Sequence, residues 1–262
     1  MKIPCFIVDA FASKPFQGNP AAVCPLENWL DDVVMQNIAA ENNLSETAFF
    51  VPRDSGYDLR WFTPAVEIDL CGHATLASAF ILFSEMANSG NAVSFHSRSG
   101  ILKVMRNADL LTLDFPSRPP APCAVPEPLI RGLGKQPIEV LKARDYFAVY
   151  GSEDEVRSLK PDFALLGTLD EKVIVTAPGT DCDFVSRFFA PTAGVPEDPV
   201  TGSAHCTLIP YWAKRLHKTK LFARQVSRRG GELFCKLSGE RVLIGGKAVL
   251  YSRGQIEINT TR

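Results

Sequence analysis

Two short segments of the chain contain residues that could bind an anion at the start of a helix. They read Gly72-His73-Ala74-Thr75 and Gly202-Ser203-Ala204-His205, and neither contains a carboxylate. The first four N–H groups of a helix have no partner within it and carry partial positive charge, and glycine lets a ligand approach them. The segments therefore predict two sites for a carboxylate or phosphate. Ordinary capping, for instance by Thr201, is the alternative.

Two carboxylates are candidates for general acid/base chemistry. Glu46 enters a strand that is apolar on both faces, with Ala48 and Phe50 on its own side. A carboxylate partly removed from water in this way can exchange protons near neutral pH, whereas a solvent-exposed strand start is the alternative. Asp198 lies in the proline-containing loop 191–199 just before Gly202. It could face the same anion site or cap its own loop.

Apolar stretches follow both glycine segments and predict buried helices. Residues 73–83 carry no charge unless His73 is protonated, and residues 203–216 become charged only near their end. A helix that is apolar on every side belongs in a core. A third helix is predicted over residues 28–42, where apolar residues recur at intervals of three and four. That pattern is typical of an amphipathic surface helix.

The flanks of the two buried helices resemble each other. Trp61-Phe62-Thr63-Pro64 precedes the first and Phe188-Phe189-Ala190-Pro191 precedes the second, each followed by an acidic loop. The two prolines are 127 positions apart and the glycines at the helix starts 130 apart. Self-similarity at about half the chain length indicates a duplicated domain, each copy wrapping strands around a central helix. Coincidence between short Gly- and Ala-rich segments is the alternative.

The remaining pattern predicts an α+β fold of two strand-rich, barrel-like halves. Residues 117–128 contain five prolines, a density that favours an extended linker and excludes a helix. We therefore expect one half over 1–116 and the other over 129–262, or a C-terminal strand that returns to the first half. The expected strands are Ile3–Asp9, Glu46–Pro52, Ile101–Arg106, Leu110–Phe115, Tyr146–Tyr150, Lys172–Ala177, Phe184–Phe189, Arg224–Ser227, Glu232–Leu237 and Lys247–Tyr251.

The composition limits the classes of partner. The 262 residues carry a formal net charge of −1, and 46% of them are hydrophobic. This balance offers no basic surface for nucleic acid or an anionic membrane, and no apolar stretch is long enough to span a bilayer. Seven cysteines without a CxxC pair, in a chain with no export signal, predict free thiols and a cytoplasmic location.

Four motifs in register resemble the phenazine-biosynthesis PhzF-like family. They are Phe16-Gln17-Gly18-Asn19-Pro20-Ala21-Ala22-Val23, Asn43-Leu44-Ser45-Glu46-Thr47, Gly72-His73-Ala74-Thr75 and Glu197-Asp198-Pro199-Val200-Thr201-Gly202-Ser203-Ala204. The resemblance covers most of the chain. The family is related to diaminopimelate epimerase and proline racemase. It implies two barrel-like halves, each around a central helix, with the active site in the cleft between them.

The resemblance also implies roles for individual residues. Glu46 matches the main acid/base, His73 the histidine after the first glycine, and Asp198 and Ser203 the acid and serine of the second motif. Asn19 matches a substrate-contacting position. Amides near Gly72 and Gly202 would hold the substrate carboxylate. No cofactor and no metal are implied, and a homodimer is expected.

The family match leaves the substrate open. The string Leu70-Cys71-Gly72-His73-Ala74-Thr75 resembles the broad family, whose substrates are mostly unassigned, and the isomerase of phenazine synthesis differs after the histidine. The expected reaction is therefore isomerisation of a small carboxylate-bearing metabolite by proton transfer.

Three alternatives are weighed against this reading. A two-thiol racemase would use Cys71, but the matching position of the second half is Thr201, whose hydroxyl is too weak an acid or base. A zinc site would need the adjacent His205 and Cys206, which point about 100° apart on a helix. A non-catalytic metabolite-binding protein would have little use for Glu46 and Asp198, since carboxylates repel an anionic ligand. No nucleotide-binding glycine loop is present.

Overall fold

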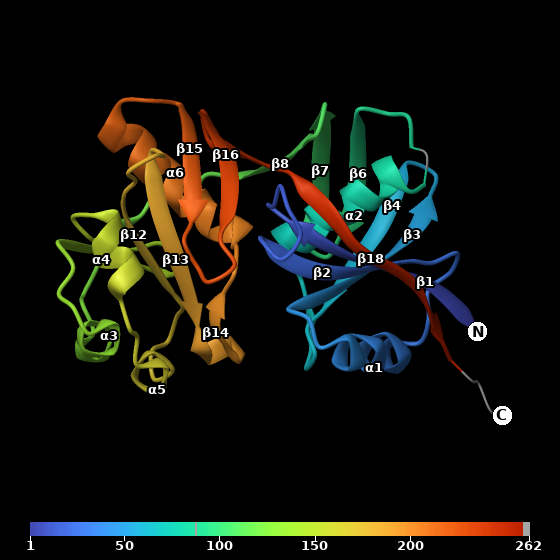
Figure 1. Ribbon diagram of the computed structural model, residues 1–262, viewed down its shortest axis with the longest axis horizontal. Coiled ribbons are helices and arrows are strands. Elements are labelled where there is room, and N and C mark those ends of the chain that lie inside the picture. The colour runs from blue at the N-terminus through green and yellow to red at the C-terminus, as the bar shows by residue number, and fades with distance from the viewer. Residues whose placement is uncertain (87, 259–262) are drawn as a thin grey trace. The chain divides into compact units, whose positions relative to one another are not determined.

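The computed structural model describes the chain except for residues 87 and 259–262 (Figure 1). The chain forms two compact units. The first contains Met1–Asp114 and the segment that begins at Gly245, and the second is Phe115–Ile244. These units differ from the expected halves 1–116 and 129–262 because the last strand, β18 (Ala248–Glu257), pairs antiparallel with the first, β1 (Lys2–Ala10). Residues 117–128 belong to the second unit.

The first unit wraps strands around one apolar helix. Its pairs are antiparallel for β1–β2, β3–β4, β4–β5, β6–β7 and β7–β8, and parallel for β2–β3 and β4–β6. The strands not yet given are β2 (Asn19–Pro25), β3 (Glu46–Arg53), β4 (Gly56–Phe62), β5 (Glu67–Ile68), β6 (Ala92–Ser97), β7 (Gly100–Asn107) and β8 (Leu110–Pro116). Helix α2 (Gly72–Ser84) contacts β1, β2 and β3 and is buried over most of its length. Helix α1 (Asp32–Asn42) packs against β3 and β4 and buries Met35, Ile38 and Ala39.

The second unit repeats this plan around helix α6 (Gly202–Leu216). Antiparallel pairs are β9–β10, β10–β11, β12–β13, β13–β14 and β15–β16, and parallel pairs are β11–β12 and β13–β15. The strands are β9 (Ala121–Pro122), β10 (Glu139–Lys142), β11 (Tyr146–Val149), β12 (Val173–Pro178), β13 (Phe184–Ala190), β14 (Val195–Asp198), β15 (Lys220–Gln225), β16 (Gly231–Ser238) and β17 (Arg241–Gly246). In the core, Trp212 of α6 stacks on Phe184 with ring centroids 5.7 Å apart.

Short helices complete the second unit, and one of them corrects an expectation. They are α3 (Glu127–Leu133), α4 (Glu153–Ser158), α5 (Phe163–Leu166) and the 3-10 turn η1 (Pro191–Ala193). The segment 117–128 was expected to contain no helix, yet α3 begins at Glu127 with Pro128 in its first turn. A proline there breaks no helical hydrogen bond, because the first N–H groups have no partner within the helix.

The predicted duplication is visible in the order of elements. In the first unit β4 is followed by β5 and then α2, and in the second β13 is followed by β14 and then α6. Both central helices begin at the predicted glycine, with Cys71 and Thr201 as the residues before them. The predicted α+β fold is thus confirmed, with a strand-rich unit around a central helix in each half.

A partly buried arginine–glutamate pair lies at the same place in both repeats. Arg60 of β4 donates two hydrogen bonds to Glu67 of β5, at 2.7 and 2.8 Å. Arg187 of β13 donates two to Glu197 of β14, at 2.8 and 2.9 Å. Each guanidinium also lies over a phenylalanine ring two residues along its strand. Each pair therefore joins the two strands that lead into a central helix, and bidentate geometry fixes their spacing.

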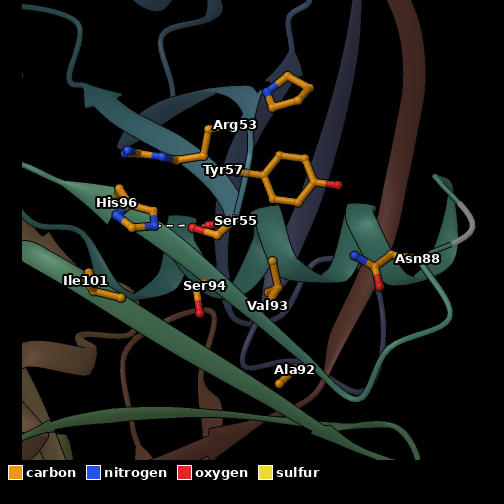
Figure 2. A pocket seen from close by; sticks show the side chains of 11 residues that line it. Arg53, Ser55, Tyr57, Asn88, Ala92, Val93, Ser94, His96 and Ile101 are labelled. Atoms are coloured by element: carbon orange, nitrogen blue, oxygen red, sulfur yellow. Dashed lines mark hydrogen bonds between the residues drawn. The ribbon is translucent and has the colours of Figure 1, made fainter.

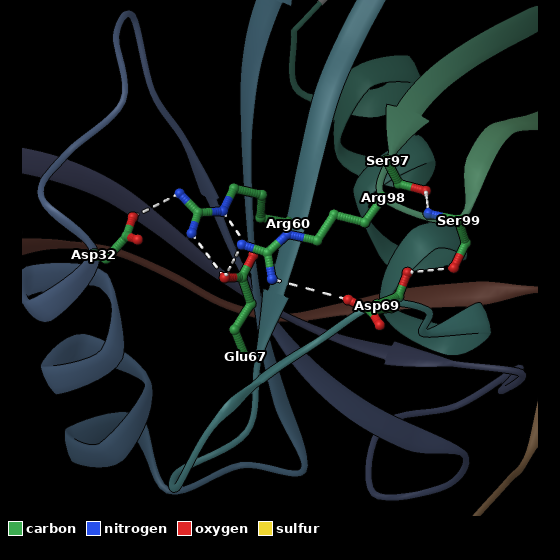
Figure 3. A network of polar contacts seen from close by, with 7 residues as sticks. All are labelled: Asp32, Arg60, Glu67, Asp69, Ser97, Arg98 and Ser99. Atoms are coloured by element: carbon green, nitrogen blue, oxygen red, sulfur yellow. Dashed lines mark hydrogen bonds and ion pairs between the residues drawn. The ribbon is translucent and has the colours of Figure 1, made fainter.

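The first of these pairs belongs to a larger network (Figure 3). Arg60 also bonds Asp32 at 2.8 Å, and Arg98 lies 2.8 Å from Glu67 and 3.8 Å from Asp69. The Ser99 hydroxyl donates to the carbonyl of Asp69. The loop between β5 and α2 is thereby tied to α1 and to the β6–β7 turn. This loop supplies Cys71, the residue before the helix start.

None of the helices in the described chain has the length and apolar character that a membrane span requires.

Candidate active site

Glu46 is the first residue of β3 and lies beside β2. Asn43 follows the last residue of α1 and caps the helix. Its left-handed backbone (φ 47°) turns the chain towards β3. Ala21 of β2 is the parallel partner of Glu46. The carboxylate side chain is 16% exposed, so it is mostly removed from water but still accessible. This is the setting that the apolar strand predicted for an acid/base residue.

His73, in the first turn of α2, faces the Glu46 carboxylate. His73 Nε2 lies 3.1 Å from Glu46 Oε2, and the imidazole is 6% exposed. Within the described residues, neither atom has a hydrogen-bond partner of good geometry. The contact is therefore an ion pair at short range, and the carboxylate oxygen keeps a lone pair for a proton.

The opposite edge of the His73 ring contacts two further side chains. Nδ1 lies 3.3 Å from Asn19 Nδ2 and 3.5 Å from Cys71 Sγ. Asn19 is fully buried at the start of β2. It follows Gly18, where φ is +67° and an added Cβ would lie 2.1 Å from the carbonyl oxygen of Ala10. Only glycine fits this turn, which explains the Gly-Asn-Pro sequence and places Asn19 against the histidine.

The cluster has a definite distribution of charge. Burial lowers the pKa of His73, but Cys71 and the Glu46 carboxylate raise it more, so the pKa lies well above its ordinary 6.5. Burial, and next the nearby Glu46, raise the pKa of Cys71 to about 11. Cys71 is thus a neutral thiol at pH 7, and the raised pKa of His73 keeps the imidazole protonated. The result is a carboxylate–imidazolium pair beside an uncharged thiol.

Donor atoms of Glu46, Cys71 and His73 lie within 4.8 Å of one another, a spacing that could hold a metal ion. Sequence reasoning considered a different set, which combined Cys71 and His73 with His205 and Cys206. A thiol with a pKa of about 11 must lose its proton before it can bind a metal.

The second unit gathers polar side chains at the start of α6. The hydroxyl of Thr201 donates to Asp198 Oδ2, and the amide of Gln225 bonds both the Asp198 carbonyl and the Thr201 N–H. The Thr201 hydroxyl therefore does not cap the helix, which removes the capping alternative for that residue. Asp198 is oriented by these contacts at the end of β14, directly before the helix.

Arg144, which sequence reasoning missed, contacts the predicted Ser203. Its guanidinium donates to Ser203 Oγ at 3.1 Å and to the neighbouring Asp145 at 3.2 Å. The Arg144 side chain is 40% exposed, whereas that of Asp145 is 3% exposed. No motif in the sequence distinguishes Arg144, because the turn between β10 and β11 brings it to α6 from 59 residues away. A fixed guanidinium beside a helix start strengthens the preference of this end for an anion.

His205 contributes no charge to the start of α6. Burial lowers its pKa to about 4, and its Nδ1 lies 2.9 Å from the Thr201 carbonyl. The neutral ring donates its Nδ1 proton to that carbonyl. His205 is fully buried, and its ring centroid lies 6.0 Å from that of Phe184. The histidine of α6 therefore has a packing role.

The predicted site residues thus form one group in each unit. Glu46, His73, Asn19 and Gly72 lie together in the first unit, with Cys71 beside them. Asp198, Gly202 and Ser203 lie around the start of α6 in the second. A separate hollow of about 550 Å³, near the β3–β4 turn, contains none of them (Figure 2). Two of its polar side chains already have partners within the protein: Arg53 bonds Asp58, and His96 bonds the Ser55 carbonyl.

Known proteins match this chain over nearly its whole length. The family model described as phenazine biosynthesis-like protein matches residues 8–254. A Pseudomonas aeruginosa protein named an uncharacterized isomerase is 55% identical over 98% of this chain and 100% of its own. The crystal structure of a phenazine biosynthesis PhzF-family protein from Enterococcus faecalis has a TM-score of 0.96 and 50% identity, over 98% of this chain and 100% of that one.

A more distant structure shares the fold. A hydroxyproline epimerase from Agrobacterium vitis, solved with bound trans-4-hydroxy-L-proline, has a TM-score of 0.64 at 12% identity, over 97% of this chain and 92% of that one. These matches confirm the family resemblance and the epimerase-like fold that the motifs implied.

Proposed function

The chain belongs to the phenazine biosynthesis-like protein family, and we propose that Glu46 moves a proton on a small carboxylate-bearing metabolite without a cofactor. The family and the closely similar isomerase relative place the chain among isomerase-type enzymes. The observation that carries the finer proposal is the contact of 3.1 Å between Glu46 Oε2 and His73 Nε2.

The charge state of this pair suits the first step. The Glu46 carboxylate lies 3.1 Å from the His73 cation, and in this proposal it accepts a proton from a carbon of the substrate. Once Glu46 is protonated it can return the proton to a second carbon, which gives an isomer with no net gain or loss. One residue thus serves as base and then as acid.

The substrate carboxylate is held, in this proposal, by the amides at the helix starts. The N–H groups near Gly72 and Gly202 carry partial positive charge, and neither first turn contains an acid. The His73 cation adds to the charge at the first start. Asn19 positions the imidazole, while Asp198 and Ser203 orient the substrate. A carboxylate next to the reacting carbons also helps to acidify them.

A racemase mechanism with Cys71 as one of two bases is less well supported. The thiol is 6% exposed and has a raised pKa, whereas a catalytic thiol needs to ionise readily. The matching residue Thr201 donates its hydroxyl to Asp198. A protein that only binds the metabolite is also less well supported. An ionised Glu46 would repel an anionic ligand, so a binding protein would have little use for a carboxylate at this position.

The proposal is tested by solvent exchange. Candidate unsaturated or amino-acid-like carboxylates are incubated with the enzyme in D₂O, and NMR follows deuterium at carbon. Incorporation into a substrate, with or without net isomerisation, supports proton transfer. Binding of a carboxylate, detected by calorimetry, without exchange at any of its carbons would favour a binding protein.

We further propose that the enzyme works in the reducing cytoplasm, since all seven cysteines are free thiols.

A further inference from the structure

Cys5 and Cys24 occupy opposite positions on two neighbouring strands. Strands β1 and β2 pair antiparallel, with Ile7 opposite Ala22 and Phe6 opposite Val23. The next pair in the same register is Cys5 and Cys24. Both pack against the apolar cluster that includes Met35 and Ile38 of α1, so their side chains share one face of the sheet.

The backbone at this pair can accept a disulfide. Residues opposite one another on antiparallel strands have Cα atoms about 4.5–5.5 Å apart. The Cα separation in disulfides is about 4.4–6.8 Å. Both side chains also contact the same apolar cluster. A bond between the sulfur atoms therefore requires no rearrangement of the strands.

The two thiols differ in exposure and acidity. Cys5 is partly exposed and Cys24 is fully buried. The neighbouring Cys24 lowers the pKa of Cys5. Conversely, Cys5 and burial raise the pKa of Cys24 well above its usual value. Cys5 is thus the accessible, more readily ionised thiol. Cys24 keeps its proton and lies on the neighbouring strand. The arrangement is typical of an attacking cysteine, here Cys5, and a resolving cysteine, here Cys24.

We propose that Cys5 and Cys24 form a peroxide-reactive thiol pair that closes to a disulfide. The Cys5 thiolate attacks one oxygen of hydrogen peroxide, which yields a sulfenic acid at Cys5 and releases the other oxygen as water after protonation. The Cys24 sulfur then attacks the Cys5 sulfur, its proton leaves with the hydroxyl group as a second water, and the S–S bond forms. Two thiols lose two electrons in total, and peroxide gains them.

The other cysteines lack this combination. Cys123 and Cys182 are partly exposed, and neither is paired with a second cysteine in the described structure. Cys71, Cys206 and Cys235 are buried, and burial raises the pKa of each. The pair is also separate from the proposed catalytic residues, because Cys24 is next to the last residue of β2, whereas Asn19 begins β2 and Glu46 pairs with Ala21 near that start.

The test is mass spectrometry of the reduced, full-length protein after a small excess of hydrogen peroxide. A disulfide lowers the intact mass by about 2 Da. Chymotrypsin cuts after Phe6 and Phe16, so the peptides with Cys5 and Cys24 stay joined only through the S–S bond. Joined peptides are expected in the wild type and in the control Cys182→Ser, and separate peptides after reduction.

Two variants separate the roles of the thiols. Cys5→Ser should give no joined peptide. Cys24→Ala should accumulate a Cys5 sulfenic acid that dimedone traps, because nothing resolves it, and circular dichroism at the same temperature checks that this core variant is folded. The proposal is overturned if wild type shows only separate peptides while peroxide oxidises another thiol, or if the linked product persists in Cys5→Ser.

Discussion

Arg187 and Glu197 form two parallel hydrogen bonds between the strands that lead into α6. The arginine is 9% exposed, and its guanidinium also donates to two backbone carbonyls of the α4 region. The pair repeats the contact of Arg60 with Glu67 in the first unit. Because the loop after each pair leads directly into a central helix, the pairs should stabilise each unit and fix the position of that helix start.

The first prediction concerns the stability that this contact provides. Glu197→Gln keeps the shape of the side chain but leaves the buried Arg187 without its counter-charge. Hydrogen bonds to charged groups contribute about 1.5–3 kcal/mol each, so we expect a loss in that range in the free energy of unfolding. Urea denaturation measures it from the transition midpoint at constant slope.

The matched control is Glu232→Gln in the same unit. Its partner Arg224 is 37% exposed and Glu232 is 41% exposed, so this pair should contribute less than about 1 kcal/mol. Equal losses in the two variants would show that the Arg187 contact has no special structural role.

The second prediction concerns the two buried histidines, which should titrate in opposite directions. Because Cys71 and the Glu46 carboxylate together raise the pKa of His73 more than burial lowers it, His73 should remain protonated above pH 6.5, whereas His205 should stay neutral until about pH 4. NMR titration of the ring protons, assigned with His73→Gln and His205→Gln, follows both. A His73 signal that titrates below 6.5 would contradict the ion pair with Glu46.

The same shifts set the pH dependence of stability. The folded-state pKa of His73 is raised, so its contribution is fully present below the unfolded value of about 6.5 and is lost as pH rises through the folded pKa. The folded-state pKa of His205 is lowered, so its term reduces stability as pH falls from about 6.5 toward 4. Urea midpoints of each variant and the wild type, compared across pH, should differ with these opposite slopes.

Sequence patterns predicted most of the fold, and the motifs predicted Glu46 and His73 as site residues. The apolar run after each glycine predicted α2 and α6 because a helix without a polar face must be buried. The strand after Glu46 was equally clear from its apolar residues. The sequence did not predict the strands β2, β4, β5, β6, β9, β10, β14 and β17, because short stretches such as Gly56–Phe62 lack strict alternation. The strand expected over Arg224–Ser227 begins and ends earlier, as β15 (Lys220–Gln225). The return of β18 to β1 was left as an alternative, since strand pairing across the chain leaves no local signal.

Contacts made by tertiary folding were beyond sequence reasoning. The sequence placed Glu67 and Glu197 in acidic loops and gave neither a partner. The structure shows that each forms an ion pair with an arginine of the preceding strand. Arg144 reaches Ser203 only because the β10–β11 turn lies beside α6. The family motif implied that Asn19 contacts the substrate, but its contact with His73 was not predicted and depends on the left-handed turn at Gly18.

The third prediction separates the proposed mechanism from a cysteine racemase. Cys71→Ala removes a neutral buried thiol, so solvent exchange into the substrate should fall less than about 10-fold, well short of the 10²–10⁴-fold that a general acid/base contributes. In the wild type, Cys71 should react with iodoacetamide more slowly than the partly exposed Cys123, as peptide mapping would show. Rapid alkylation of Cys71 near pH 7 would point to an activated thiolate and revive that mechanism.

The fourth prediction asks whether residues of both units act in one reaction. If Glu46 and Asp198 serve the same substrate, the effects of Glu46→Gln and Asp198→Asn on turnover should not add, because residues that act together lose their function together. The double variant should then be little slower than Glu46→Gln alone. Rate losses that multiply would indicate independent roles for the two carboxylates.

The central claim is that Glu46 moves the proton, and Glu46→Gln tests it most directly. The amide keeps the size of the side chain and removes the titrating group. With a substrate found by exchange in D₂O, the variant should lose at least about 100-fold in the rate of deuterium incorporation, while binding of the carboxylate changes little. Thermal unfolding shows that the variant is folded. Exchange at the wild-type rate in folded Glu46→Gln would contradict the account and assign the proton transfer to another residue.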